Sequence, residues 1–247
     1  MRPGATIVQF VRLIAAVAML LSCACAAGQD RDPYAAPRRA LVSELQAQAR
    51  EDTGSLTRID REVLAVIGRV PRHLYVPKAE LAHAYENRPL GIGYGQTISQ
   101  PYIVALMTAL AQPGAGQKIL EVGTGSGYQA AVLAEFGADV HTIEIIAPLA
   151  TQAAQRLRPY RNIATRTGDG YYGWKEQAPF DSIIVTAAAS SIPPPLLAQL
   201  KPGGRMVIPV GSSFFTQTLM LVEKDAQGRA RTRQVLPVRF VPLTGGH

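Results

Sequence analysis

The chain has 247 residues, of which 47% are hydrophobic and 17% are charged, and its formal net charge is +7. This length is enough to bury one full α/β core, and no internal repeat or long low-complexity tract divides the sequence. Its lysines and arginines are scattered instead of forming a block, so we do not expect a nucleic-acid-binding surface.

Residues 1–26 have the layout of an export signal. A basic start precedes an apolar run over 13–21, and small residues then lead to an Ala-x-Ala cleavage site after Ala26. The run ends in a lipoprotein processing box, whose Cys23 would carry the lipid and so bring the protein to a membrane. Both cysteines lie in this segment, so cleavage after Ala26 would leave no thiol. We expect an exported, periplasmic protein; the alternative is a cytoplasmic enzyme with a fortuitously apolar extension.

A polar linker over 27–37 is expected to lead into a single domain over 38–247, whose N-terminal part is helical to about residue 95. The expected elements of this part are a helix over 38–69, a proline-bounded loop over 70–77 and a short helix over 78–85. His73 and His83 have no partners at metal-ligand spacing, so we expect them to be structural and expect no metal site.

A glycine-rich turn follows the first buried strand. The apolar run 119–122 is followed by glycines at 123, 125 and 127, and 128–136 has helical spacing. This pattern predicts a strand, a tight turn and a helix. Glycine permits unusual backbone angles there and lets a ligand approach the main chain. The Gly-x-Gly-x-Gly spacing, with Glu121 two residues before the first glycine, favours S-adenosylmethionine over a dinucleotide. The next strand ends at Glu144, about 20 residues on, where an acid can accept hydrogen bonds from ribose hydroxyls.

The remaining pattern predicts an open α/β sheet. The expected elements are a helix over 147–157, strands over 163–167 and 180–185, a helix opened by 192–196, a strand over 206–210, and an antiparallel pair over 219–222 and 235–241. Asp169 lies between two glycines at a strand end, where it could accept a hydrogen bond from an exocyclic amine. The small residues of 186–189 follow another strand end and leave room for a substrate.

From about Val70 to Leu243 these residues resemble the protein-L-isoaspartate O-methyltransferase family of S-adenosylmethionine-dependent enzymes. The matching segments are 88–90, 95–101, 120–133, 168–170, 185–189, 200–211 and 238–243. The Gln-Thr-Ile-Ser-Gln-Pro segment within 95–101 is the specific one, because the glycine loop occurs across many methyltransferases. Two features depart from the family: Ile145 stands where arginine is frequent, and the export-like segment is atypical.

The resemblance implies a Rossmann-like seven-stranded methyltransferase sheet, mostly parallel with one antiparallel strand, and a helical N-terminal addition. It implies methyl transfer from S-adenosylmethionine to the free carboxylate of L-isoaspartyl, and also D-aspartyl, residues in damaged proteins and peptides, without metal or nucleic acid. Ser99 is then the active-site hydroxyl, which we expect to hold the carboxylate or the transfer geometry and not to act as a covalent nucleophile.

The resemblance and the strand-end positions together define the expected site. The residues expected to bind the cofactor are Gln96, Thr97, Ile98, Ser99, Glu121, Gly123, Thr124, Gly125, Ser126, Gly127, Glu144, Asp169 and Gly170. The residues expected to contact the substrate are Ser99, Ala187, Val210, Arg239 and Val241.

Four alternatives stay open at this point. A different S-adenosylmethionine-dependent O-methyltransferase would share most of these features. A nucleic-acid methyltransferase would need an Asp/Asn-Pro-Pro-aromatic loop or a Pro-Cys nucleophile, and the sequence has 186–189 in that place. An NAD-dependent oxidoreductase would share Glu144 but would leave 95–101 unexplained. An exported remnant of the fold that only binds partners is the non-enzymatic alternative.

Overall fold

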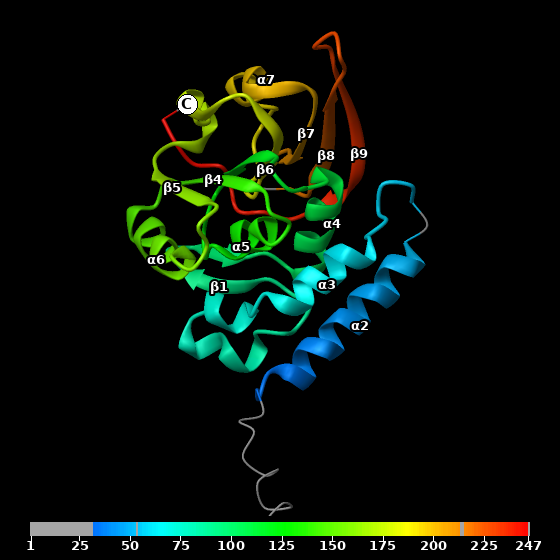
Figure 1. The fold of residues 1–247 in the computed structure, drawn as a ribbon, viewed down its shortest axis with the longest axis vertical. Helices are drawn as coiled ribbons and strands as arrows, with labels where there is room; N and C mark the ends of the chain where they lie inside the picture. Colours follow the sequence, from blue (N-terminus) through cyan, green and yellow to red (C-terminus); the bar gives the residue numbers. More distant parts are fainter. Residues whose placement is uncertain (1–31, 53, 213–214, 247) are drawn as a thin grey trace, which may run out of the picture. The chain divides into compact units, whose positions relative to one another are not determined.

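The computed structural model describes residues 32–52, 54–212 and 215–246 (Figure 1). Its contacts divide the chain into two units, Met1–Ala36 and Pro37–His247, and the second holds every strand of the described chain. The predicted export segment, with Cys23, lies outside the described residues, as does the first part of the predicted linker. No helix in the described part is long and apolar enough to cross a bilayer.

The N-terminal part is helical, but it contains two helices where the sequence predicted one over 38–69. Its elements are the helices α2 (Ala35–Glu51) and α3 (Arg61–Arg69) and the 3₁₀ turns η2 (Arg72–Tyr75) and η3 (Lys78–His83). The helical pattern is interrupted by a turn, in which the Thr57 hydroxyl donates to the carbonyl oxygens of Asp52 and Gly54 at 3.3 and 3.0 Å. Glycine and hydroxyl side chains favour such turns over a continuous helix.

A short hairpin occupies the segment around Gly95, where we expected the helical N-terminal part to end. Strands β1 (Leu90–Gly93) and β2 (Gln96–Ile98) pair antiparallel in a two-stranded sheet of their own. The turn between them contains Tyr94 and Gly95 at positive φ, 54° and 71°. β1 has four residues, two of them glycine, and β2 has three, so neither strand is long enough to show the alternating pattern that marks a strand in the sequence.

The main sheet has seven strands in the order β5-β4-β3-β6-β7-β8-β9. They are β3 (Lys118–Val122), β4 (Asp139–Glu144), β5 (Ile163–Thr167), β6 (Phe180–Val185), β7 (Leu200–Val210), β8 (Gln217–Lys224) and β9 (Ala230–Val238). Within the described chain, β8 alone runs antiparallel to both of its neighbours, which confirms the predicted sheet. The prediction of the last strand over 235–241 was wrong in its limits, because β9 begins at Ala230, inside the charged stretch expected to be a connection.

Helices cover both faces of this sheet (Figure 1). They are α4 (Pro101–Ala111), α5 (Tyr128–Ala134) and α6 (Ala147–Leu157) on one face and α7 (Pro194–Gln199) on the other. Side chains alternate between the faces along a strand. Leu120 and Val122 of β3 therefore join the cluster formed by Phe180 and Leu196 on the α7 face, whereas Glu121 points to the α5 face.

The strand order creates a crevice between β3 and β6. From β3 the chain winds outward through β4 and β5, and from β6 it winds in the opposite direction through β7. The connections that follow β3 and β6 consequently diverge at the carboxyl ends of these strands. In open α/β sheets, ligands bind at this reversal point.

Candidate active site

The glycine loop leaves β3 at the crevice and can be built only from glycine at its first position. Gly123 has a φ of +93°, and a Cβ added there would lie 2.4 Å from the Thr186 hydroxyl oxygen. That hydroxyl donates to the carbonyl oxygen of Gly123 at 2.6 Å, and this hydrogen bond clamps the start of the loop to the residue that follows β6. Thr186 was expected only to leave room for a substrate; a hydroxyl immediately after a buried strand is the signal that could have revealed the clamp.

Glu144 ends β4 beside this loop, as the sequence predicted. Its Oε2 accepts a hydrogen bond from the amide of Gly125 at 2.7 Å, and its Oε1 accepts one from the amide of Ile146 at 2.9 Å. Each carboxylate oxygen has two acceptor sites, so both retain capacity for a ligand hydroxyl. The cleft in front of Glu144, which is the predicted cofactor cleft, is lined by Gln96, Thr97, Val122, Gly123, Gly125, Ile143, Glu144, Ile145, Ile146, Gly170, Thr186, Ala187, Val241, Pro242, Leu243 and Thr244.

Glu121 lies behind the loop, in a row of buried side chains linked by hydrogen bonds. The hydroxyl of Thr142 donates to its Oε2 at 2.5 Å, and the hydroxyls of Thr124 and Thr142 are 2.6 Å apart. Burial raises the pKa of Glu121 to about 8; the bond from Thr142 opposes this rise and the nearby charge of Glu144 adds to it. The side chain is 0% exposed and faces a small hollow that is also lined by Ser99. Predicted cofactor residues that line the same hollow are Thr97, Ile98, Gly123, Thr124, Gly125 and Ser126.

Asp169 follows β5 and directly precedes Gly170, which lines the cleft in front of Glu144. Its Oδ1 accepts a hydrogen bond from the amide of Tyr171 at 2.9 Å, and its Oδ2 accepts one from the amide of Gly246 at 3.2 Å. The next residue, Gly170, lies against β3, where an added Cβ would be 2.4 Å from Cγ1 of Val122. The close approach of the chain to β3 therefore requires glycine at this position.

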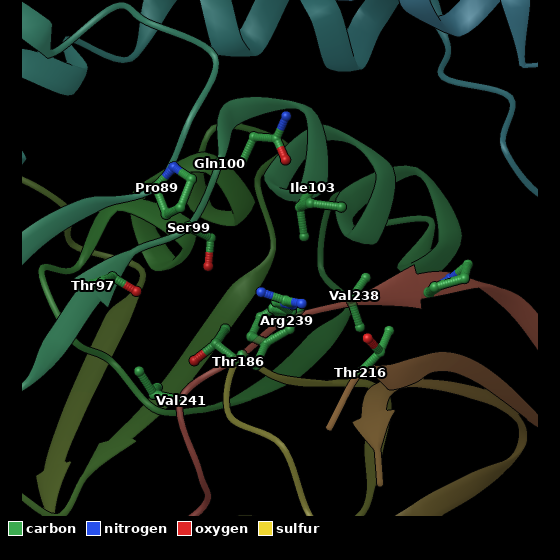
Figure 2. A pocket seen from close by; sticks show the side chains of 12 residues that line it. Pro89, Thr97, Ser99, Gln100, Ile103, Thr186, Thr216, Val238, Arg239 and Val241 are labelled. Carbon is green, nitrogen blue, oxygen red and sulfur yellow. The ribbon is translucent and has the colours of Figure 1, made fainter. Parts of the chain in front are cut away.

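A second cavity, of about 410 Å³, adjoins the cofactor cleft (Figure 2). The side chains of Ser99 and Arg239 point into it from the end of β2 and from the segment after β9. Thr97, Thr186 and Val241 line both spaces, so the cavity and the cleft meet there. Other residues of the cavity wall are Pro89, Gln100, Ile103, Thr216, Pro237, Val238 and Phe240.

Two residues expected to contact the substrate do not line the second cavity. Ala187 lines the cofactor cleft, not the second cavity. Val210, at the end of β7, packs against the α7-face core and bridges to Ala189, and neither the cleft nor the cavity described above includes it. Val210 ends β7 and Ala187 comes shortly after β6, and both strands end near the site, so position in the sequence alone could not separate the two spaces.

The doubly wound sheet, the glycine loop at the strand reversal and an acid at the end of the next strand define an α/β enzyme that binds a nucleotide-type cofactor. The adjoining cavity provides a place for a second reactant beside the cofactor. The Gly-x-Gly-x-Gly spacing assigns this arrangement to the S-adenosylmethionine-dependent methyltransferases.

Comparison with known proteins narrows this class to one family. The family model described as protein-L-isoaspartate(D-aspartate) O-methyltransferase matches residues 41–247. The chain is 63% identical over 237 residues to protein-L-isoaspartate O-methyltransferase 2 of Syntrophobacter fumaroxidans, covering 94% of this chain and 96% of that protein. It is 58% identical over 240 residues to protein-L-isoaspartate O-methyltransferase 1 of Cupriavidus necator, covering 95% and 92%. The chain belongs to the protein-L-isoaspartate O-methyltransferase family.

Solved structures have the same fold. A protein-L-isoaspartate O-methyltransferase superposes with a TM-score of 0.75 at 26% identity, over 84% of this chain and 66% of that chain. A Plasmodium falciparum protein described as a putative protein-L-isoaspartate O-methyltransferase, in complex with S-adenosyl-L-homocysteine, superposes with a TM-score of 0.71 at 24% identity, over 84% and 98%. The predicted fold class is thereby confirmed.

Replacing Glu121 by glutamine is expected to flatten the dependence of stability on pH. The pKa of Glu121 is raised from 4.5 to about 8 on folding, so the stability associated with its proton is fully present below about pH 4.5 and is lost as the pH rises to about 8. Between about pH 5 and pH 8, urea unfolding should show a smaller loss of unfolding free energy in Glu121→Gln than in the natural chain. Glu135→Gln, on the surface beside Arg69, is the control and should behave as the natural chain; an equal loss in Glu121→Gln would contradict the assignment.

Proposed function

We propose that the protein transfers the methyl group of S-adenosylmethionine to the free carboxylate of L-isoaspartyl residues, and also of D-aspartyl residues, in damaged proteins and peptides. The observation that carries this proposal is the meeting of the cofactor cleft and the second cavity at Thr97, Thr186 and Val241. A methyl donor in one space can face an acceptor in the other there. The names of the relatives and the bound ligand of the Plasmodium protein support the choice of substrate and cofactor.

The reaction needs positioning more than proton transfer. The carboxylate oxygen attacks the methyl carbon in line, the bond from carbon to the sulfonium sulfur breaks, and its electron pair stays on sulfur, giving a methyl ester and S-adenosylhomocysteine. The acceptor is already ionised near neutral pH and the sulfonium is already activated, so orientation and the exclusion of water supply the catalysis. In this proposal the Ser99 hydroxyl holds the carboxylate, and the Arg239 guanidinium attracts its charge.

On the cofactor side, we assign the ribose hydroxyls to Glu144 and the exocyclic amine of the adenine to Asp169. The glycine loop and the β2 segment would enclose the rest of the cofactor. Because Gly246 already donates to Asp169, adenine binding at this carboxylate requires the end of the chain to move or to share the acceptor. Val241 would contact both reactants, since it lines both spaces.

Paired peptides test the substrate. With labelled S-adenosylmethionine, we expect the protein to label a peptide containing L-isoaspartate and not the same peptide containing L-aspartate, because only the former presents the carboxylate in the geometry that the family recognises. The label should be released as methanol by mild base, as for a methyl ester. Equal labelling of both peptides would refute the proposed substrate, and labelling of other carboxylic acids alone would favour a different O-methyltransferase.

Replacement of Glu144 tests the cofactor site. Glu144→Ala should weaken S-adenosylmethionine binding by about 1–3 kcal/mol, the range for a hydrogen bond that involves a charged group. Titration calorimetry measures the change, and a thermal unfolding curve shows whether the loop has also lost its support from Glu144. Asp139→Ala, at the exposed opposite end of β4, should leave the affinity unchanged. Undiminished affinity in Glu144→Ala would remove Glu144 from the site.

We also propose that residues 1–26 direct export, with lipid attachment at Cys23 as one form of the mature protein. The basic start, short apolar run and Ala-x-Ala site support this proposal. Sequencing the N-terminus of protein isolated from envelope and cytosol fractions should find residue 27, or a lipid-modified Cys23, in the envelope. Full-length chain beginning at Met1 or Arg2, recovered mainly from the cytosol, would show that the segment does not act as a signal.

A further inference from the structure

Arg72 is a charged residue in the interior, outside the residues assigned to the two reactants. Its side chain is 0% exposed, although η2 lies in a segment that the sequence predicted to be a loop. Moving a charge from water into a protein interior is costly unless hydrogen bonds compensate. The contacts of Arg72 therefore indicate what its burial achieves.

One hydrogen bond of Arg72 reaches the active site. Its Nη2 donates to the backbone carbonyl oxygen of Ser99 at 2.8 Å. Its Nε and Nη1 have no hydrogen-bond partner among the residues that the structure describes. The hydrogen bond that compensates for burying this cation is therefore made to the carbonyl of Ser99, whose hydroxyl faces the second cavity.

An aromatic ring fixes the direction of the guanidinium. Its carbon lies 4.9 Å from the centre of the Tyr128 ring, which in turn packs edge-on against Tyr75 at 5.5 Å. A cation over an aromatic face is attracted by the ring. Burial lowers the pKa of Arg72 to about 10, so the group remains charged at neutral pH. Tyr128 is the first residue of α5, directly after the glycine loop, and its buried ring holds the guanidinium in place.

We propose that Arg72 is a positioning residue for methyl transfer: by holding the Ser99 carbonyl, it sets the direction in which the Ser99 hydroxyl enters the second cavity. Ser99 lies in the segment that connects β2 to α4. Without the hydrogen bond from Arg72, this segment loses its buried contact with η2 of the N-terminal part. The role of Arg72 rests on the proposed function, in which Ser99 holds the acceptor carboxylate.

Kinetics and hydrogen exchange together test this role. In Arg72→Met, which keeps the apolar stem, kcat for an isoaspartyl peptide should fall about 10- to 100-fold, because a displacement of about 1 Å is enough for such a loss. Arg72→Lys keeps a cation and a donor and should recover part of it. Amides over 96–100 should exchange faster in both variants, while those of α6 stay unchanged. Arg69→Met, three residues earlier with a side chain 55% exposed, should match the natural chain.

Other outcomes would overturn the proposal. Unchanged kcat and unchanged exchange over 96–100 in a folded Arg72→Met protein would do so. If that variant does not fold, Arg72→Lys decides by the same two measurements. Failure of both variants to fold, or exchange that rises equally throughout the domain, would make Arg72 a general stabilising residue. If the natural protein does not methylate isoaspartyl peptides, the proposed function fails, but the exchange pattern still reports whether Arg72 orders the Ser99 segment.

Discussion

The parallel pairing of β3 with β4 on one side and β6 on the other is the constraint on which the site depends. In this register Val122 lies opposite Ile143 and Val185, so the ends of the three strands lie within one residue of one another. Three residues are thereby held at the same edge of the sheet: Gly123 directly after β3, Glu144 at the end of β4, and Thr186 directly after β6. A shift of one residue along any of these strands would turn the polar side chains to the other face.

The features that the sequence predicted well are those encoded locally. The strand, glycine turn and helix of 119–136 carry their signals within a few residues, and the acid of the next strand falls at the distance that a βαβ unit imposes. The hairpin at 90–98 was missed because its two strands have three and four residues. The break between α2 and α3 was missed because the helical spacing resumes beyond it in nearly the same phase.

Features that depend on long-range packing could not be read from the sequence. Arg72 stands between prolines in a segment of mixed polarity, and no local pattern distinguishes a buried arginine from a solvated one. Likewise, Val210, Thr186 and Ala187 all stand at or shortly after strand ends. Only the folded chain shows that Thr186 lines both spaces, Ala187 lines the cleft alone and Val210 lines neither. Glu121 and Arg72, which lie at or beside the site, each keep buried polar atoms that have no hydrogen-bond partner among the described residues. Proteins tolerate such costs in stability at functional sites.

The last described residues cross the carboxyl edge of the sheet, from the end of β9 to the loop after β5 (Figure 1). Pro242 bridges to Ala188 on the way, and the amide of Gly246 reaches the carboxylate of Asp169. A segment fused to this end of the chain would therefore begin a short distance from that carboxylate. For laboratory preparation, an affinity tag at this end would emerge beside the cofactor cleft and compete with what enters it, so a tag removed before assay, or one placed in a surface turn, is the safer design.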